Sequence, residues 1–324
     1  MKTEQRVAIL SATHIRKAAI SPAECINWVE QSFRMKYESE LPAKLSIHPQ
    51  GDDFFNSMPA LLPPVYGRFG IKVVSRIEGQ EPALKSDILL YDSHSGELLA
   101  IIDGDWVTTM RTGAVTALTV RTFRATTSNI YSLMGLGNTA CASALCLIEM
   151  ANGAPVHFRL LRYKDQAERM QRRLAGYANV TFEIIDSIDE FIAGAEIVIS
   201  CVTSAPTNMF CPNDSLFRPG ILVIPVHSRG FQNCDLAFDK VYGDDTGQVC
   251  GFKYFSKFRR YTEFSRVLLG EEPGREGADE RILCYNTGLG LHDVLFACKL
   301  YDLLGNEPDC ESFIQRREHE IFWI

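Results

Sequence analysis

The sequence predicts an α/β protein in which a doubly wound parallel sheet follows an α+β domain. From Ser128 onward, short apolar segments alternate with helical ones, and strands that are apolar on both faces are typical of parallel sheets. Before that point, short β-rich segments follow one another without long helices, which favours antiparallel pairing. The length of 324 residues suits about two domains, at roughly 100–200 residues each.

The first domain is expected to begin with a helix and to continue as a sheet. Residues 13–40 have helical periodicity, and Ser21 and Pro22 form a typical N-cap and first helical position. Strands are then predicted at 44–48, 54–59, 69–77, 86–92 and 98–103, with a hairpin turn at 92–96. Because the connections are short, the sheet is expected to be mostly antiparallel.

A helix over 106–123 is expected to carry the chain into the second domain. Strands are predicted there at 129–134, 156–161, 180–184, 197–201 and 221–226, with helices at 138–150, 165–176 and 188–193. Residues 288–304 predict a long apolar helix, and the polar tail after Gly305 is expected to pack on the first domain. The expected domains are therefore 1–121 with 303–324, and 122–302. Residues 270–279 look like a flexible charged loop.

The composition excludes several classes of protein. Lys and Arg number 33 against 40 Asp and Glu, a net charge of −7 without a basic block, so nucleic acid is not an expected partner. No segment approaches the roughly 20 apolar residues that cross a bilayer, and the first residues are too polar for a secretory signal, so the cytoplasm is the expected location. The 10 cysteines form no CxxC pair and no histidine lies near them at metal-site spacing, so we expect reduced thiols and no metal.

The most informative motif is the segment GLGNTA, which lies after an apolar strand and before a helix. Gly135 permits a tight turn, Gly137 lets the backbone approach a pyrophosphate, and Ala140 lets helix and strand pack closely. Asn138 and Thr139 complete the turn. In this context the motif predicts a Rossmann-type dinucleotide site, and an ordinary glycine-rich turn is the alternative.

The end of the next predicted strand bears on the choice of cofactor. An Asp or Glu is usual there, because a carboxylate accepts hydrogen bonds from the ribose hydroxyls, but this chain has Arg162 and Lys164. Two cations favour a 2′-phosphate, so the pattern leans to NADP(H) over NAD(H). A solvated basic turn is the alternative, and both cofactors stay open.

Four segments in order resemble the ornithine cyclodeaminase and μ-crystallin family: GIKVVS at 70–75, DGDWVTTMRTG at 103–113, GLGNTA, and YNTGLGLHD at 285–293. The resemblance runs from about Lys44 to about Ala297. It implies a homodimer, a substrate and dimerisation domain beside a Rossmann domain, and chemistry at the Cα–N bond of an amino acid or its imine. It also implies that Arg111, Thr112 and Gly288 contact the cofactor.

Lys72 is the expected catalytic residue. It lies in an otherwise apolar segment and matches the family lysine, and a desolvated lysine can bind a carboxylate or move a proton. Met58, on the neighbouring predicted strand, and Lys44 are expected at the substrate, with Lys44 where the family often has an arginine. Arg111 stands in an uncharged stretch and can clamp a carboxylate or a phosphate. A snorkelling Lys72 and a structural Arg111 ion pair are the alternatives.

The segment after the strand at 221–226 departs from the family. Ornithine cyclodeaminases have an aspartate there that binds the substrate amine, whereas this chain has Arg229 nearest to that place and Asp235 as a more distant acid. A cation would repel a diamine and attract an acidic or keto-acid substrate. His227 is a candidate proton donor or nicotinamide neighbour, because ligands bind at the carboxyl ends of such strands. A structural histidine is the alternative.

Further cofactor contacts are expected at the ends of the same strands. Val226 precedes His227, and Val202, Thr203 and Ser204 follow the strand at 197–201, where they can reach the nicotinamide ribose. A local Ser/Thr turn is the alternative for Thr203 and Ser204.

The last third resembles one subgroup of the family more loosely. GDDTG at 243–247, GRE at 274–276 and ERI at 280–282 are similar to N-(2-amino-2-carboxyethyl)-glutamate dehydrogenases of siderophore pathways. The alternative is a charged loop that covers the second domain.

The function expected from these residues is an NAD(P)-dependent oxidoreductase that acts on the Cα–N bond of an L-amino acid or its imine. A cyclodeaminase that releases ammonia from ornithine or lysine is the first alternative, and a non-catalytic μ-crystallin-like binding protein is the second. Metal chemistry and GxSxG-type hydrolysis have no supporting motif.

Overall fold

The computed structural model describes residues 2–202, 214–227 and 232–318. The chain forms two compact units: unit 1 comprises residues 1–21, 35–108 and 289–324, and unit 2 comprises 22–34 and 109–288. The domain boundaries expected from the sequence are 1–121 with 303–324, and 122–302. They remain a prediction. Thr203, Ser204 and Arg229 lie outside the described residues.

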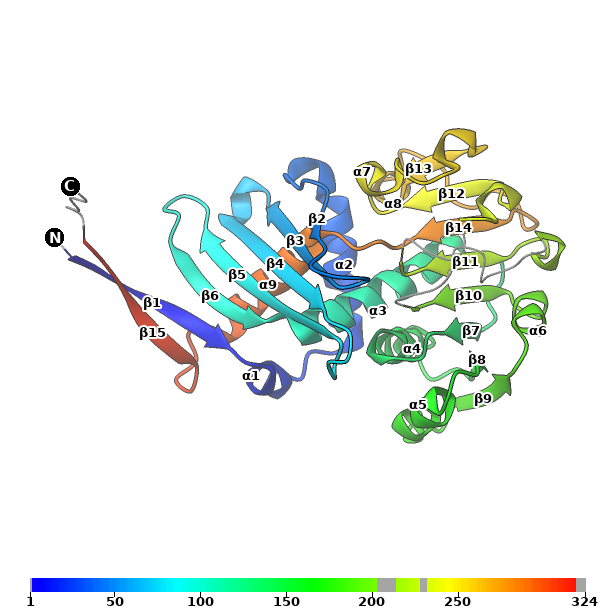
Figure 1. The fold of residues 1–324 in the computed structure, drawn as a ribbon, viewed down its shortest axis with the longest axis horizontal. Helices are drawn as coiled ribbons and strands as arrows, with labels where there is room; N and C mark the ends of the chain where they lie inside the picture. Colours follow the sequence, from blue (N-terminus) through cyan, green and yellow to red (C-terminus); the bar gives the residue numbers. More distant parts are fainter. Residues whose placement is uncertain (1, 203–213, 228–231, 319–324) are drawn as a thin grey trace. The chain divides into compact units, whose positions relative to one another are not determined.

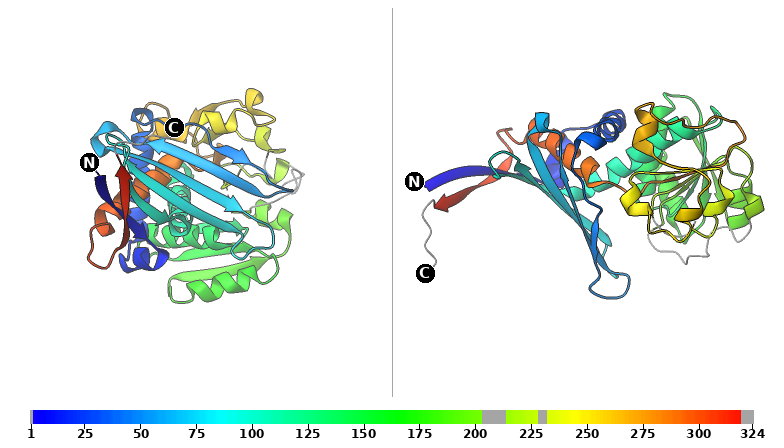
Figure 2. Two further views of the ribbon diagram at one scale, coloured as in Figure 1. Left: turned by 60° about the vertical axis from the view of Figure 1, so that its left-hand side comes forward. Right: turned by 90° about the horizontal axis from the view of Figure 1, so that it is seen from above.

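Unit 1 is built on a seven-stranded sheet in the order β15-β1-β6-β5-β4-β3-β2, labelled in Figure 1. Figure 2 shows the ribbon from two further sides. The pairs from β2 to β6 are antiparallel, as expected, whereas β1 pairs with β6 in parallel and with β15 antiparallel. The bounds are β1 (Lys2–Leu10), β2 (Leu45–Ile47), β3 (Phe54–Leu61), β4 (Arg68–Arg76), β5 (Leu84–Asp92), β6 (Leu98–Asp103) and β15 (Glu311–Glu318).

Helix α9 (Gly290–Leu304) packs on this sheet, and glycines let the start of the helix come close to the strands. A Cβ on Gly290 would lie 2.7 Å from the carbonyl oxygen of Met58, and a Cβ on Gly70 would lie 3.0 Å from Val294. Glycines at both places therefore let the start of α9 lie directly on β3 and β4.

The expected single helix over 13–40 was wrong. The structure has α1 (Ala12–Lys17) and α2 (Pro22–Arg34), and the chain breaks between them where Ala19 adopts a φ of +49°. Because Pro22 cannot donate a backbone hydrogen bond, it begins a new helix rather than continuing the first. The polar tail forms β15, which pairs with β1, so the expectation that it packs on the N-terminal unit was correct.

Unit 2 contains an entirely parallel eight-stranded sheet in the order β13-β12-β14-β11-β10-β7-β8-β9 (Figure 1). The order β9-β8-β7-β10-β11 is that of a Rossmann fold, so the predicted fold class is confirmed. The strands are β7 (Ile130–Met134), β8 (Val156–Leu161), β9 (Val180–Ile185), β10 (Ile197–Ser200), β11 (Leu222–Pro225), β12 (Lys240–Gly243), β13 (Tyr261–Glu263) and β14 (Ile282–Tyr285).

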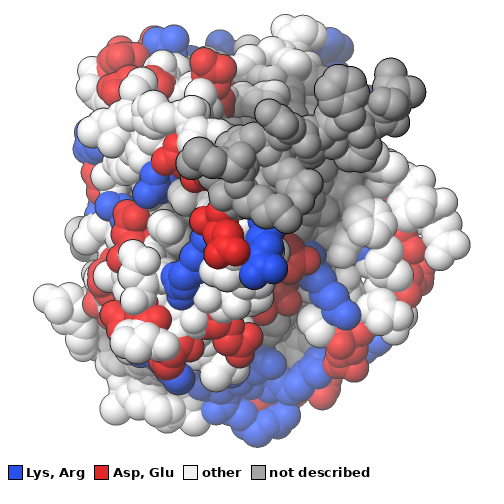
Figure 3. Space-filling model, turned by 90° about the vertical axis from the view of Figure 1, so that its left-hand side faces the viewer, with Lys and Arg blue, Asp and Glu red and all other residues white. Residues whose placement is uncertain are grey.

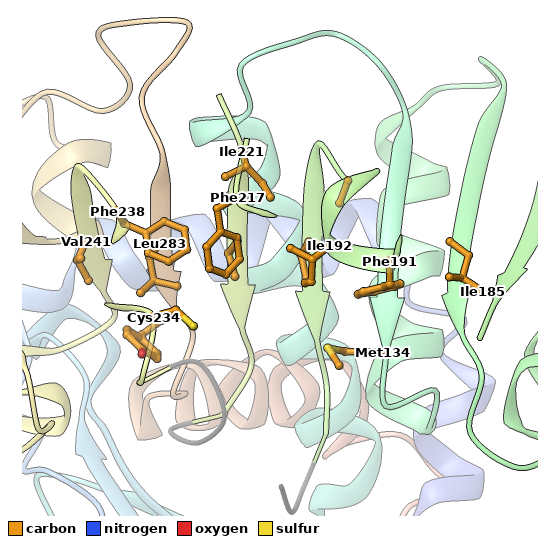
Figure 4. Packing of buried hydrophobic residues seen from close by; sticks show 14 of the residues in the cluster. Met134, Ile185, Phe191, Ile192, Phe217, Ile221, Cys234, Phe238, Val241 and Leu283 are labelled. Carbon is orange, nitrogen blue, oxygen red and sulfur yellow. The ribbon is translucent and has the colours of Figure 1, made fainter. Parts of the chain in front are cut away.

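The helices that accompany this sheet follow the predicted alternation. They are α3 (Gly104–Phe123), which begins in unit 1, α4 (Asn138–Met150), α5 (Gln166–Leu174), α6 (Ile188–Ala193), α7 (Thr246–Val249) and α8 (Phe264–Leu268). The cluster in Figure 4 joins side chains from the strands to side chains from α6, including Met134, Phe191, Val241 and Leu283. This buried apolar layer fixes the positions of the strand ends that carry the site.

The segment 270–279 is not a free flexible loop. Half-buried Arg275 donates hydrogen bonds to the carbonyl oxygens of Phe123 at 2.7 Å and Gly220 at 3.0 Å. Lys240, itself only 5% exposed, bonds the carbonyl of Gly274 at 2.9 Å and the carboxylate of Glu276 at 2.6 Å. The side chains of Arg275 and Glu276 therefore hold against unit 2 a segment that the sequence suggested to be a flexible charged loop.

Charges of both signs are interspersed on the face shown in Figure 3. Among the residues that the structure describes, no helix has the length and apolar character needed to cross a bilayer.

Candidate active site

The turn between β7 and α4 has the geometry that the GLGNTA motif predicts. Gly135 has a φ of +73°, and a Cβ there would lie 2.5 Å from the backbone nitrogen of Val202, just past β10. At Gly137 a Cβ would meet nothing within 4 Å, so the backbone at the start of α4 is open to an approaching group. Since a helix N-terminus attracts anions, this turn fits a pyrophosphate.

Helices α3 and α4 are in backbone contact beside that turn. A Cβ on Gly113 would lie 2.5 Å from the carbonyl carbon of Ala142. Arg111 and Thr112, each 7% exposed, precede this contact on α3. The structure therefore places both predicted cofactor residues on a helix packed against the one that begins at Asn138.

Arg111 lies directly against Gly288. Gly288 has a φ of +85°, and a Cβ there would lie 2.5 Å from Nη1 of Arg111. The backbone of Gly288 is fixed from the other side, because its N–H donates to Oδ2 of Asp244 at 2.7 Å and its carbonyl accepts from Gln248 at 3.0 Å. Arg111 and Gly288, both expected at the cofactor, therefore lie against each other, and Asp244 and Gln248 fix the backbone of Gly288.

His227 lies at the carboxyl edge of the sheet, as predicted. Its Nε2 is 2.7 Å from Oγ of Ser200, the last residue of β10, and Ser200 is fully buried. The N–H of Val226 donates to the carbonyl of Ser200 at 2.8 Å, which holds the end of β11 beside β10. A hydrogen bond to Ser200 orients the imidazole at the edge where doubly wound sheets bind ligands.

Arg162 follows β8 directly, at the expected adenosine-ribose position. Its Nε donates to Asp186 at 2.6 Å and its Nη1 to Glu168 at 2.5 Å. These carboxylates raise the pKa of the Arg162 guanidinium. The pKa of Glu168 is lowered, first by the hydrogen bond from its own backbone and second by the hydrogen bond from Arg162. Lys164 has a φ of +51°, with its ammonium 5.3 Å from the centroid of the Tyr163 ring.

Unit 1 buries the predicted catalytic lysine completely. Lys72 and Asp293 are both 0% exposed, and Nζ of Lys72 lies 2.8 Å from Oδ2 of Asp293 near the start of α9. In the sheet register Lys72 is opposite Met58 on one side and Ile88 on the other, which are 4% and 0% exposed. An ammonium so enclosed requires its carboxylate partner, and such groups are typical of functional sites.

Lys44 is close in the sheet register to Met58, which is opposite Lys72. It immediately precedes β2, whose first residue, Leu45, pairs with Ser57 beside Met58. Lys44 is partly exposed, in contrast to Lys72. The three predicted substrate contacts in unit 1, Lys44, Met58 and Lys72, therefore lie on adjacent strands or next to them.

Asp235 does not replace the aspartate that the family has after β11. It lies in the short 3-10 helix Asp235–Ala237, is 1% exposed, and accepts a 2.5 Å hydrogen bond from the hydroxyl of Tyr285. Burial raises the pKa of Asp235 to about 7, although the bond from Tyr285 lowers it. A buried acid with a raised pKa, already bonded to Tyr285, is unsuited to hold a substrate ammonium.

Five residues of these sites were not named as functional from the sequence: Glu168, Asp186, Ser200, Asp244 and Asp293. Asp244 and Asp293 stand in the quoted segments GDDTG and YNTGLGLHD, so a search for carboxylates in those motifs would have found them. Ser200 carries no local signal, because only the parallel pairing of β10 with β11 brings it to His227.

The fold and the open glycine turn define a Rossmann-type dinucleotide-binding protein with a second, α+β unit. The sequence profile of one family matches residues 5–307. The chain belongs to the ornithine cyclodeaminase/mu-crystallin family, as its motifs predicted.

Three relatives are 23–24% identical to the chain over the aligned residues. The nodulation efficiency protein NfeD of Rhizobium meliloti is 24% identical over 296 residues, 87% of this chain and 90% of that protein. A Delta(1)-pyrroline-2-carboxylate reductase of Bacillus cereus is 23% identical, over 72% and 76% of the two chains. An N-((2S)-2-amino-2-carboxyethyl)-L-glutamate dehydrogenase of Staphylococcus aureus is 24% identical, over 66% of each.

Solved structures have the same fold. A Thermococcus litoralis Delta(1)-pyrroline-2-carboxylate reductase, in complex with NADH and L-proline, has a TM-score of 0.79 at 22% identity and covers 91% of this chain and 97% of its own. An archaeal alanine dehydrogenase dimer with bound NAD has a TM-score of 0.80 at 18% identity, with 95% and 99% covered. The reductases and dehydrogenases among the relatives agree with the oxidoreductase expected from the sequence.

Proposed function

We propose that this protein is an NAD(P)-dependent oxidoreductase that acts on the Cα–N bond of an L-amino acid or its imine. The observation that carries the proposal is the fully buried Lys72–Asp293 pair, in a chain whose other unit has an open dinucleotide turn. Relatives named as reductases of cyclic imino acids support the substrate class.

The nicotinamide, when bound, supplies or accepts the hydride at the substrate carbon. In the reducing direction the imine carbon gains the hydride and the nitrogen gains a proton, which Lys72 donates or stabilises there. Lys44 and Met58 hold the rest of the substrate, and Arg111 binds a carboxylate or a cofactor phosphate. The protein contributes orientation of the substrate and stabilisation of the developing charge.

His227 and Arg229 are the proposed polar residues at the nicotinamide end. His227, oriented by Ser200, is suited to donate a proton or to fix the nicotinamide, and Arg229 is suited to attract an acidic substrate. Val202, Thr203, Ser204 and Val226 are the proposed contacts of the nicotinamide ribose.

The test follows the absorbance of reduced nicotinamide with a panel of L-amino acids, 2-oxo acids with ammonia, and cyclic imines. A net absorbance change that is lost in Lys72→Met, while nucleotide affinity is retained, supports the proposal. Ammonia release from ornithine or lysine without net redox change would show a cyclodeaminase instead. Ligand binding that Lys72→Met leaves unchanged, without turnover of any substrate, would favour a binding protein.

We also propose that the protein works as a homodimer in the cytoplasm. The sheet face opposite α9 leaves apolar side chains exposed on neighbouring strands: Ile47 is 60% exposed, Phe55 43% and Val73 37%. Such a patch is typical of an interface, and a related dehydrogenase of the same fold is a dimer. The nine cysteines among the described residues are free thiols, which suits a reducing compartment.

A further inference from the structure

We propose that the adenosine-ribose end of the dinucleotide site selects the free 2′-hydroxyl of NAD(H) over the 2′-phosphate of NADP(H), with Glu168 and Asp186 as the selecting residues. The inference rests on the proposed function, because it concerns the same dinucleotide. It reverses the preference that Arg162 and Lys164 suggest from the sequence alone.

Arg162 is at the right place to meet the ribose, but its guanidinium is already engaged. The residue follows the last residue of β8, and its N–H donates to the carbonyl of Ile185 at 2.8 Å, which fixes the turn against the end of β9. Nε donates to Asp186 at 2.6 Å and Nη1 to Glu168 at 2.5 Å. A phosphate that used the same donors would have to displace these carboxylates.

The charged residues at 162–169, taken together with Asp186, carry no net positive charge. The cations within residues 162–169 are matched by an equal number of carboxylates when Asp186 is included: Arg162, Lys164 and Arg169 against Asp165, Glu168 and Asp186. Arg169 lies 3.4 Å from Asp165, in a pair of its own. Lys164 offers a point charge, without the two-pronged geometry of Arg162.

A 2′-phosphate and a 2′-hydroxyl on the ribose should therefore interact differently with Arg162, Glu168 and Asp186. A 2′-phosphate displaces one carboxylate from Arg162 and then lies beside two negative side chains, which repel it. A 2′-hydroxyl is neutral and can donate to either carboxylate, the role usually filled by an acid at the end of this strand. The side chains of Glu168 and Asp186 are 37% and 74% exposed, so a ligand can reach them.

The test measures the dissociation constants of NADH and NADPH by nicotinamide fluorescence for the wild-type protein and for E168Q, D186N and the double variant. Glu149→Gln is the matched control, because Glu149 is an exposed carboxylate at the other end of α4. We expect the wild type to bind NADH at least about tenfold more tightly than NADPH, a difference of about 1.4 kcal/mol. The double variant should reduce this ratio about tenfold, and the control should leave it unchanged.

Wild-type protein that binds NADPH as tightly as NADH would overturn this inference while leaving the oxidoreductase proposal intact. An unchanged ratio in the double variant would overturn the roles of Glu168 and Asp186. Failure to bind either nucleotide would reject both proposals, since the dinucleotide site itself would then be absent.

Discussion

At the scale of single residues, the buried Lys72–Asp293 pair should matter both to stability and to catalysis. Lys72→Met leaves a carboxylate without its ammonium in a fully buried position, so we expect the free energy of unfolding to fall by about 3–5 kcal/mol. The double variant Lys72→Met/Asp293→Asn removes both charges, so it should regain much of the lost free energy of unfolding. It should remain inactive. Urea unfolding and turnover of the three proteins separate the two roles.

Equal stability of the wild type and Lys72→Met would contradict this account of the pair. Nucleotide affinity is the control for folding, because the glycine turn belongs to unit 2 and Lys72 to unit 1.

Asp235 should make the stability of unit 2 depend on pH. Its pKa is raised from 3.8 to about 7 by burial, so between these values the folded state holds a proton that the unfolded state has lost. The contribution of Asp235 is therefore fully present below about pH 3.8 and is lost progressively as the pH rises to about 7, with a full span of roughly 4 kcal/mol.

Asp235→Asn cannot ionise, so the stability of the wild type relative to Asp235→Asn should fall as the pH rises from 5 to 8. Urea denaturation of both proteins at the two pH values is the measurement. A stability difference between them that does not change with pH would show that Asp235 is ionised throughout.

At the scale of elements, the turn from β7 into α4 contains two glycines with different roles. Gly135 is required for folding, and Gly137 is expected to be required for nucleotide binding. Gly135→Ala places a Cβ 2.5 Å from the backbone of Val202 at a positive φ, so we expect a loss of stability of at least about 1–3 kcal/mol. Gly137→Ala places its methyl group in open space, so the melting temperature should barely change.

The same methyl group at residue 137 would occupy the position of an approaching pyrophosphate. The affinity of Gly137→Ala for NADH should therefore fall about tenfold or more, measured by fluorescence titration. Unchanged affinity in a folded Gly137→Ala protein would place the dinucleotide elsewhere.

At the scale of the whole molecule, the apolar sheet face predicts the oligomeric state. Ile47→Asp/Phe55→Asp puts charges on a register pair of that face, and we expect sedimentation velocity to show monomers where the wild type forms dimers. Leu303→Asp is the matched control, since Leu303 is 51% exposed on α9 and does not belong to the face. A wild-type protein that is monomeric at micromolar concentration would refute the proposed dimer.

The sequence predicted those parts of the fold and site that depend on local patterns. The glycine turn and the burial of Lys72 follow from segments of fewer than about ten residues, in which apolar side chains show the strand. The strands β1 and β15 were missed, because their charged side chains hide the alternation and their pairing joins residues near the two ends of the chain. Asp293 as the partner of Lys72, and Asp186 as the partner of Arg162, were missed for the same reason: tertiary structure brings them together.

The pairing of β1 with β15 also sets an order of events during synthesis. Every residue of unit 2 lies between 22 and 288, so its parallel sheet can close while later residues are still being added. Unit 1 must wait for residues 289–318, because α9 brings Asp293 to Lys72 and β15 completes the sheet. Until residues 289–318 are synthesised, a nascent chain exposes the edge of β1 and the Lys72 ammonium without its carboxylate partner. Chaperone binding should therefore prevent aggregation most effectively at this stage.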